Sequence, residues 1–427
     1  MLECIRMLIS DLHIHSRYSR ACSRELTLPN IAAVCEKKGI DLVSTGDFTH
    51  PAWFSHIKEE LTEVSAGIFS LRAHQSKTRF ILGTEISCIY KQNEKVRRIH
   101  LCIFAPSFFA VDKFNRALEE RGCNIHSDGR PIIGLSAKEV LKILLDVSSE
   151  GVMIPAHAWT PWFSVFGSKS GFDSLDECFE ELTPQIFAIE TGLSSDPKMN
   201  WRISGLDNIS LVSNSDAHGL ENLGREANVL NTDFAHLTYN SFFNIIKRRN
   251  PKEFLHTIEF FPEEGKYHLD GHADCGVVFT PEETKKQKGL CPKCGKPLVI
   301  GVMHRVDNLA DKSEKDVYMV PAGRVPYKSI VPLKEVIGNA LGKNKTTKIV
   351  GAMYEKILKE LGSEFHILLD AELNDVAVAG TPEISEAVSR MRAGELHIEP
   401  GYDGLYGKVK IFSDEDRPRR AAQQNLL

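Results

Sequence analysis

Short apolar runs alternate with amphipathic segments over the first 255 residues of the chain. The runs lie at residues 7–15, 40–50, 78–90, 97–105, 152–159, 185–192 and 208–218, while residues 28–39 and 137–151 have helical periodicity. This alternation predicts an α/β fold with a parallel or mixed sheet and crossover helices. Because nearly every run carries or ends in His, Asp or Glu, it predicts a barrel whose chemistry lies at the carboxyl ends of the strands.

The pattern changes after about residue 256. Residues 268–298 are short, Gly-rich and cysteine-bearing, and the region from Asp311 onward has helical stretches separated by Gly and Pro. The last 15 residues, SDEDRPRRAAQQNLL, are polar. We therefore expect three units: a barrel over residues 1–258, a small metal-stabilised domain over 259–312, and a mostly helical region with a polar tail over 313–427.

Composition and charge narrow the class of protein. The 427 residues are 42% hydrophobic and 26% charged, and they contain neither a long apolar run nor a secretory signal pattern, which predicts a cytoplasmic protein without a membrane partner. The net charge is −5, but residues 285–350 hold 14 Lys and Arg against 5 Asp and Glu. Such a basic segment is either a footprint for phosphates or a solvated lysine-rich surface.

Histidines and carboxylates recur near the ends of the predicted strands. Asp11, His13 and His15 occupy alternate positions and would share one face of a strand. A single histidine among apolar residues is more often part of a core. Here, however, several histidines and carboxylates would converge at the same end of the predicted barrel. The set suits two or three divalent metals: His13, His15, Asp47, His50, Glu85, His100, His157, Glu190, Asp216 and His218.

A second metal signal lies in the small middle unit. Its spacing is His-x2-Cys-x15-Cys-x2-Cys, formed by His272, Cys275, Cys291 and Cys294. Two knuckles with this spacing predict one structural zinc in a ribbon-like domain. The three cysteines are firm ligands, whereas His268 or His304 could replace His272. A four-coordinate site of this kind is closed, so it folds its domain and does not catalyse.

Five motifs occur in the order DLHIH (11–15), TGDFTH (45–50), GTEIS (83–87), PAHAW (155–159) and NSDAH (214–218). This set resembles the polymerase and histidinol phosphatase (PHP) family, which implies a distorted seven-stranded (β/α)7 barrel. The resemblance implies one metal on His13, His15, Glu85 and Asp216, and a second on Glu85, His100 and His157. Asp47, His50 and His218 are candidates for a third, although the family's usual early histidine is missing here.

The implied chemistry is hydrolysis of a phosphate ester by metal-activated water, with Asp216, Glu85 and His157 as catalytic candidates. Zn, Mn or Fe would suit the ligands, and Mg could support activity. The fold alone does not separate a nuclease from a phosphatase of the histidinol-phosphate type or from a catalytically silent binding module. The zinc motif and the basic segment favour a nuclease.

Further motifs narrow the resemblance: TGDFTHPAW, GLSSDPKMNWR, NSDAHGLENLGREAN, CPKCGKPLVIGVMHRVDNLAD and IEPGYDGLYGKVKIF. In this order they resemble the endonuclease Q family of DNA-repair nucleases. The resemblance implies a nick on the 5′ side of a deaminated base (uracil, hypoxanthine or xanthine) or an abasic site, in double- or single-stranded DNA.

Action on such a base requires its extrusion from the stack. Aromatic walls for it, or DNA contacts, are predicted at Phe48, Trp53, Trp159, Trp162, Trp201 and Arg202, although most such aromatic residues belong to cores. The end of the tail, QQNLL (423–427), resembles the opening of a motif that binds the sliding clamp, without its aromatic pair.

Overall fold

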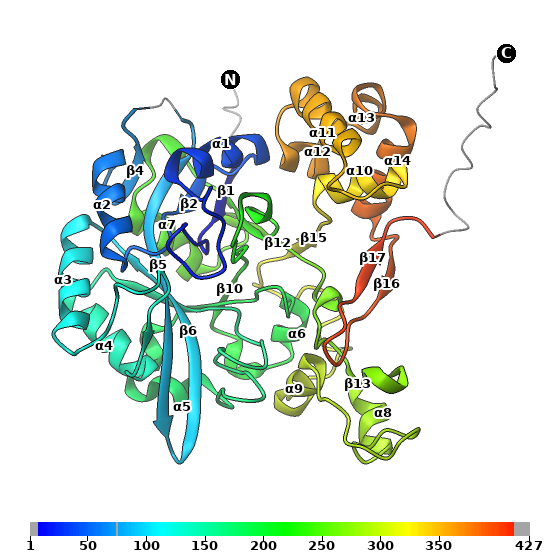
Figure 1. Ribbon diagram of the computed structural model, residues 1–427, viewed down its shortest axis with the longest axis horizontal. Coiled ribbons are helices and arrows are strands. Elements are labelled where there is room, and N and C mark those ends of the chain that lie inside the picture. Colours follow the sequence, from blue (N-terminus) through cyan, green and yellow to red (C-terminus); the bar gives the residue numbers. More distant parts are fainter. Residues whose placement is uncertain (1–6, 74–75, 414–427) are drawn as a thin grey trace.

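A computed structural model describes residues 7–73 and 76–413 of the chain. Figure 1 shows a large α/β body that contains the elements from β1 to β12, with two smaller lobes beside it. The lobe at the lower right contains α8, α9 and β13, and the helical lobe at the upper right contains α10 to α14.

One large mixed sheet organises the α/β body. Its main path has the order β15-β12-β11-β1-β2-β5-β4-β3, and β6, β7 and β8 join it through β5 and β6. The central pair is parallel, β1 with β2, while β1 and β11 are antiparallel. The strands are β1 (Met7–Asp11), β2 (Leu42–Ser44), β3 (Leu61–Ser65), β4 (Ile68–Leu71), β5 (Arg79–Gln92), β6 (Lys95–Ala105), β7 (Ile132–Ile133), β8 (Val152–Pro155), β11 (Ala227–Asn231), β12 (Phe254–Glu259) and β15 (Tyr327–Ser329).

The strand ladders of the described residues do not by themselves show the closed barrel expected from the sequence. Strands β9 (Ala188–Glu190) and β10 (Ser210–Val212) pair with each other in a separate parallel sheet. The main path of the large sheet ends at β15 and β3, and the branch through β6 ends at β8. Strands β9 and β10 have three residues each, so they can form few ladder hydrogen bonds with neighbouring strands. The structure thus supports a mixed α/β fold.

Helices cover the body and build the lobes. Their starts follow local sequence rules: Ser136 caps α4 and forms a reciprocal capping box with Glu139, and Pro51 occupies the first turn of α2. The helices are α1 (Leu28–Lys38), α2 (Pro51–Glu60), α3 (Phe108–Glu119), α4 (Ala137–Val147), α5 (Leu175–Phe179), α6 (Pro197–Trp201), α7 (Tyr239–Arg248), α8 (Pro281–Lys286), α9 (Val302–Leu309), α10 (Leu333–Leu341), α11 (Lys348–Leu361), α12 (Glu364–Leu369), α13 (Leu373–Ala379) and α14 (Pro382–Ala393).

The C-terminal region is tied to the body by the sheet itself. Strand β15 pairs in parallel with β12, with Thr257 opposite Tyr327, and so brings the chain back to the body before the helices begin. Two further hairpins lie in the lobes: β13 (Asp270–His272) with β14 (Val277–Phe279), and β16 (His397–Glu399) with β17 (Lys408–Lys410). Among the residues described, no helix combines the length and apolar character needed to cross a bilayer.

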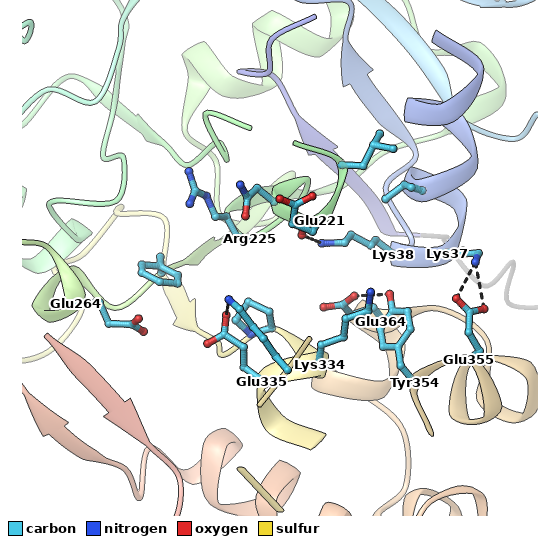
Figure 2. A pocket seen from close by; sticks show the side chains of 16 residues that line it. Lys37, Lys38, Glu221, Arg225, Glu264, Lys334, Glu335, Tyr354, Glu355 and Glu364 are labelled. Atoms are coloured by element: carbon cyan, nitrogen blue, oxygen red, sulfur yellow. Dashed lines mark hydrogen bonds and ion pairs between the residues drawn. The ribbon is translucent and has the colours of Figure 1, made fainter. Parts of the chain in front are cut away.

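A cavity of about 450 Å³ lies between the body and the helical lobe (Figure 2). Lys37 and Lys38 of α1 line one side, and Glu335, Tyr354 and Glu355 line the other. Several of the charged side chains that line the cavity form ion pairs with each other. Lys37 Nζ lies 2.9 Å from Glu355, and Lys345 Nζ lies 2.6 Å from Glu335. Because its cations and carboxylates largely offset each other, this cavity serves as a polar seam between the two parts.

Candidate metal centre

His13 and His15 follow directly after β1 and are fixed by the neighbouring loop. The His15 N–H donates to the Ala217 carbonyl at 3.0 Å, and Ile14 and Ala217 form a parallel bridge. This pairing places the first histidine motif beside Asp216. The ligand atoms of His13, His15, Glu85 and Asp216 all lie within 4.8 Å of one another. The first metal site implied by the sequence motifs is thus assembled as a group.

Glu85 also belongs to a second group. It lies on β5, and the antiparallel register with β6 sets Ser87 opposite His100. The Glu85 Oε1 atom lies 2.7 Å from His100 Nδ1 and 3.2 Å from His157 Nε2. The ligand atoms of Glu85, His100 and His157 again fall within 4.8 Å of one another. One buried carboxylate therefore joins two sets of ligands.

Two further carboxylates orient the histidines. Glu190 accepts a hydrogen bond from His13 Nδ1 at 2.9 Å, and Asp47 accepts one from His15 Nδ1 at 3.0 Å. A carboxylate on one ring nitrogen directs the lone pair of the other nitrogen toward a metal. The Nε2 atom of His13 is buried and makes no hydrogen bond within the described chain. These ligand atoms and this orphaned nitrogen fit bound divalent cations.

The centre concentrates opposite charges. Burial favours neutral rings, but the surrounding carboxylates overcome it and raise the pKa values of His13 and His15 well above the ordinary range. Burial likewise opposes ionisation of Glu85 and Asp216, but the neighbouring cationic groups lower the pKa of both carboxyls. A site of this kind favours bound cations. Positive φ angles at Asp47 (48°), His157 (28°) and Asp216 (46°) mark it as locally strained.

The structure does not bring Asp47, His50 and His218 together as a third ligand group. Asp47 accepts hydrogen bonds from His15, Ser16 and Ser19, so its oxygens are already engaged. The His50 ring lies 4.5 Å from the Tyr18 ring, and the His218 ring lies 4.5 Å from the His15 ring. Asp47 therefore positions His15 in this structure, and its assignment as a metal ligand stays a prediction.

Asp11 also has a structural role. Its carboxylate accepts from the N–H groups of Ser215 and Gly224, at 3.0 and 2.9 Å. It thereby fixes the loop that carries Asp216. Alternation along a strand predicted a shared face for Asp11, His13 and His15, but β1 ends at Asp11 and the histidines lie beyond it.

Two residues near the metals had no specific role from sequence. Glu190 was noted only as one of several strand-end carboxylates, yet it holds His13. Arg130 was not predicted at all, and its Nη1 atom lies 3.0 Å from Glu85 Oε2. Arg130 lies in the sequence Gly129-Arg130-Pro131, just before a short strand. Nothing in this local sequence indicates that the Arg130 side chain contacts Glu85.

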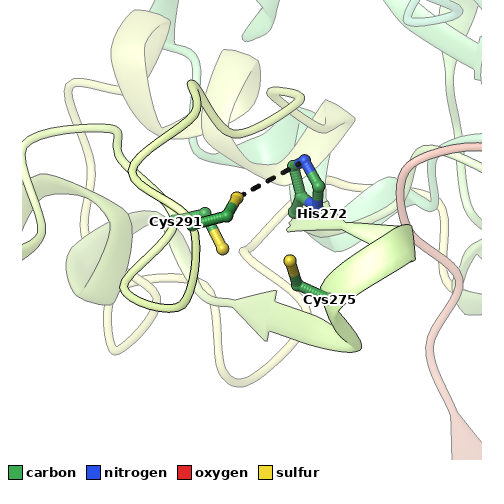
Figure 3. A group of neighbouring side chains, drawn as sticks. His272, Cys275 and Cys291 are labelled. Atoms are coloured by element: carbon green, nitrogen blue, oxygen red, sulfur yellow. Dashed lines mark hydrogen bonds between the residues drawn. The ribbon is translucent and has the colours of Figure 1, made fainter.

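The predicted zinc ligands also come together. The ligand atoms of His272, Cys275, Cys291 and Cys294 lie within 4.8 Å of one another, and Figure 3 shows the side chains of His272, Cys275 and Cys291 converging. His304 instead contacts Asp270, with Nδ1 at 2.5 Å from the carboxylate. The buried apolar cluster around this group contains only Val277, Cys291 and Leu298. A core this small suits a unit stabilised by metal.

Most of the aromatic residues predicted to contact DNA are buried. Phe48, Trp53, Trp159 and Trp201 are at most 2% exposed, and Trp159 donates its indole N–H to Asn200. They belong to the core in this structure, and none of the four presents a face to solvent. Arg202 is also mostly buried and pairs with Asp307 at 2.7 Å.

Trp162 differs, with 39% of its surface exposed. It lines a cavity of about 440 Å³ together with Thr160, Phe163, Tyr267 and His268. The cavity adjoins the second ligand group, because Thr160 Oγ1 lies 3.2 Å from His157 Nδ1 and the Phe163 ring lies 4.8 Å from the His100 ring. Trp162 and Tyr267 meet edge to face at 5.9 Å. An aromatic-walled cavity therefore opens beside the metal ligands.

Comparison with known proteins gives matches of two kinds. The family described as the MJ0043 C-terminal domain matches residues 332–395. The uncharacterized protein MJ0043 of Methanocaldococcus jannaschii is 33% identical over 257 residues, which are 60% of this chain and 31% of that protein. The uncharacterized protein YqxK of Bacillus subtilis is 29% identical over 425 residues, 95% of this chain and 100% of that protein. The chain thus spans about a third of MJ0043 and the whole of YqxK.

Two solved structures are similar along almost the whole chain. The lesion-specific endonuclease PfuEndoQ from Pyrococcus furiosus has a TM-score of 0.83 and 31% identity, covering 96% of this chain and 98% of that one. Endonuclease Q in complex with a 27-mer duplex substrate, with an abasic lesion at the active site, has a TM-score of 0.83 and 31% identity, covering 98% and 100%. With this coverage and with its two ligand groups assembled around Glu85, the chain belongs to the endonuclease Q family.

Proposed function

We propose that this protein is a DNA-repair endonuclease that hydrolyses the phosphodiester on the 5′ side of a deaminated base or an abasic site. The nick would leave a 3′-hydroxyl and a 5′-phosphate. The observation that carries this proposal is the aromatic-walled cavity directly beside His100 and His157, in a chain that aligns along nearly its full length with an endonuclease Q bound to an abasic duplex.

The ligand groups support a pair of divalent ions. His13, His15, Glu85 and Asp216 would hold one, and Glu85, His100 and His157 would hold the other. When bound, such ions polarise a phosphate ester and lower the pKa of water, so that a nucleophile forms at neutral pH. Zn, Mn or Fe suits these ligands, and Mg could support turnover. A third ion on Asp47, His50 and His218 is not favoured by their contacts.

The protein's own residues would fix the ligands and exclude solvent. Glu190 and Asp47 accept hydrogen bonds from Nδ1 of His13 and His15 and so direct each Nε2 toward the side where a metal would bind. Thr160 contacts His157 and also lines the neighbouring cavity, which links the base-binding side to the metal side. Asp216 is part of the first group and is partly exposed, with 24% of its side chain accessible. It is therefore placed to approach a substrate.

The cavity would receive the extruded nucleotide. A duplex cannot deliver a stacked base to a recessed site, so the base must leave the helix. Trp162 and Tyr267 supply aromatic faces on which a base can stack, and such stacking contributes about 1–3 kcal/mol per base. Uracil, hypoxanthine and xanthine each carry a carbonyl where the parent base has an amine. Backbone N–H groups of the cavity could recognise this shared feature.

The regions that follow the metal-binding body would bind DNA. We propose that residues 1–258 form a distorted PHP barrel, residues 259–312 a zinc ribbon, and residues 313–427 a mostly helical DNA-binding region. Support comes from the four-residue zinc group and from the basic segment 285–350. Binding of the sliding clamp is a further proposal that rests on residues 423–427, which lie outside the described residues.

A cleavage assay tests the function. A 5′-labelled duplex with one deoxyinosine or deoxyuridine is incubated with Mn or Mg and the wild-type protein, Asp216→Asn, or Asp112→Asn. Asp112 lies on α3, half-exposed, and serves as a matched control. We expect one nick 5′ to the lesion for the wild type and Asp112→Asn, a loss of at least 100-fold for Asp216→Asn, and no nick in undamaged duplex. Release of phosphate from a small phosphomonoester without any nicking would instead identify a phosphatase.

A further inference from the structure

One loop brings a guanidinium to the shared carboxylate of the metal centre. Arg130 precedes β7, and its Nη1 atom donates to Glu85 Oε2 at 3.0 Å. Glu85 is fully buried, whereas 26% of the Arg130 side chain remains accessible. Arg130 therefore reaches the centre from the solvent side, with one end on Glu85 and the rest of its surface open.

Close packing under the loop fixes this position. The Gly129 N–H donates to the Tyr18 carbonyl at 3.0 Å, and the Thr49 hydroxyl donates to the Gly129 carbonyl at 3.3 Å. A Cβ atom at Gly129 would clash with the carboxylate of Asp47 and with the hydroxyl of Ser19. Only glycine allows the backbone to pass so near to Asp47. The position of Arg130 is thus set by the same residues that orient His15.

The Asp128 carboxylate braces the other side of the turn. It accepts hydrogen bonds from the backbone N–H groups of Arg20 and Arg130, both at 3.1 Å. The Pro131 carbonyl accepts from the Ser87 N–H at 3.0 Å, two residues beyond Glu85 on β5. Hydrogen bonds on both sides of Arg130 therefore fix its backbone. The hydrogen bond to Glu85 fixes its side chain.

We propose that Arg130 binds a non-bridging oxygen of the scissile phosphate and stabilises the charge that develops on it during hydrolysis, an inference that rests on the proposed nuclease function. A guanidinium has five N–H donors in a planar fork, of which one is used by Glu85. The remaining donors match a phosphate oxygen in geometry and charge.

The charge balance supports a bound anion next to Arg130. If divalent cations were bound by the two ligand groups that share Glu85, they would repel the permanently charged side chain of Arg130. A phosphate diester there would lie between like charges and relieve the repulsion. The alternative is that Arg130 only neutralises Glu85, in which case its loss would weaken the metal ligands themselves. The two roles predict different results for metal content.

The test compares Arg130→Met and Arg130→Lys with a matched control, Arg121→Met. Arg121 lies in the same connecting segment, is exposed, and donates to the Ala117 carbonyl at 2.8 Å. Four quantities are measured: the single-turnover rate of nicking at deoxyinosine, the metal content of each loaded protein, the affinity for inorganic phosphate by calorimetry, and rescue of Arg130→Met by added guanidinium ion.

We expect Arg130→Met to nick at least about 100-fold more slowly, the usual loss for one charge-stabilising donor. Its metal content should equal that of the wild type, its affinity for phosphate should fall at least tenfold, and guanidinium should restore part of the rate. Arg130→Lys should be intermediate, and Arg121→Met should behave as the wild type.

Any of three results would overturn the proposal. A rate within about threefold of the wild type would show that Arg130 does not contact the reacting phosphate. A loss of metal in proportion to the loss of rate would show that it acts only through Glu85. If the wild type itself does not nick lesion DNA, the nuclease function fails separately, and unchanged phosphate affinity in Arg130→Met would then refute the role of Arg130.

Discussion

The substitution Asp47→Asn tests whether Asp47 orients His15 or binds a metal itself. Asp47 is fully buried and has a φ of 48°, a conformation that asparagine tolerates. The change therefore removes charge and one acceptor oxygen with little effect on the backbone. Four donors surround the carboxylate: His15 Nδ1 at 3.0 Å, Ser16 N at 2.6 Å, Ser16 Oγ at 2.7 Å and Ser19 Oγ at 2.8 Å.

An amide cannot satisfy all of these donors. Its single oxygen faces either His15 or the Ser16 N–H, and the other donor then meets an NH₂ group. An unpaired buried donor costs about 1–3 kcal/mol, so we expect that loss of stability. If His15 loses its partner, its tautomer changes and Nε2 no longer presents a lone pair. Loss of such an orienting carboxylate weakens metal binding by about 10–100-fold.

The assay is a zinc titration against a competing chelator, with metal content at saturation measured in parallel and thermal unfolding recorded for the apo protein. Asp112→Asn again serves as the control. We expect Asp47→Asn to bind the same number of ions as the wild type with lower affinity. Loss of one ion per chain, with the others bound as tightly as before, would show that Asp47 is a ligand. Unchanged affinity would refute the orienting role.

Two further predictions concern the zinc group and a buried carboxyl. Cys291→Ser should lose one zinc per chain and make residues 268–298 sensitive to limited proteolysis, because the local core is too small to hold without metal; full zinc content would contradict this. Burial, with the Asp196 carboxylate adding to it, raises the pKa of Glu259 to about 8. The neutral carboxyl stabilises the fold fully below its ordinary pKa near 4.5, and this stability is lost as pH rises toward 8. Glu259→Gln should therefore unfold at a higher temperature than the wild type at pH 8.5 but not at pH 4; equal curves at pH 8.5 would refute the assignment.

The sequence by itself picked out most of the side chains that the structure gathers into candidate ligand groups. His13 and His15, Glu85 and Asp216 each stand beside an apolar run, and the spacing from His272 to Cys294 fits one tetrahedral site. These signals are local: strand ends gather at one edge of a sheet, and two knuckles close on one ion. The structure brings the side chains of both sets together as candidate ligand groups.

Only the tertiary structure decided how the remaining polar and aromatic residues divide between support and surface. Asp47 and Trp159 follow predicted strands just as ligands do, but one is enclosed by donors and the other by core. Arg130 reaches Glu85 across 45 residues of sequence, because the glycine before it lets the loop press against Asp47. Hydrophobic pattern and spacing report which face of an element is buried. They do not report which distant side chain that face will meet, and this is set by packing among elements.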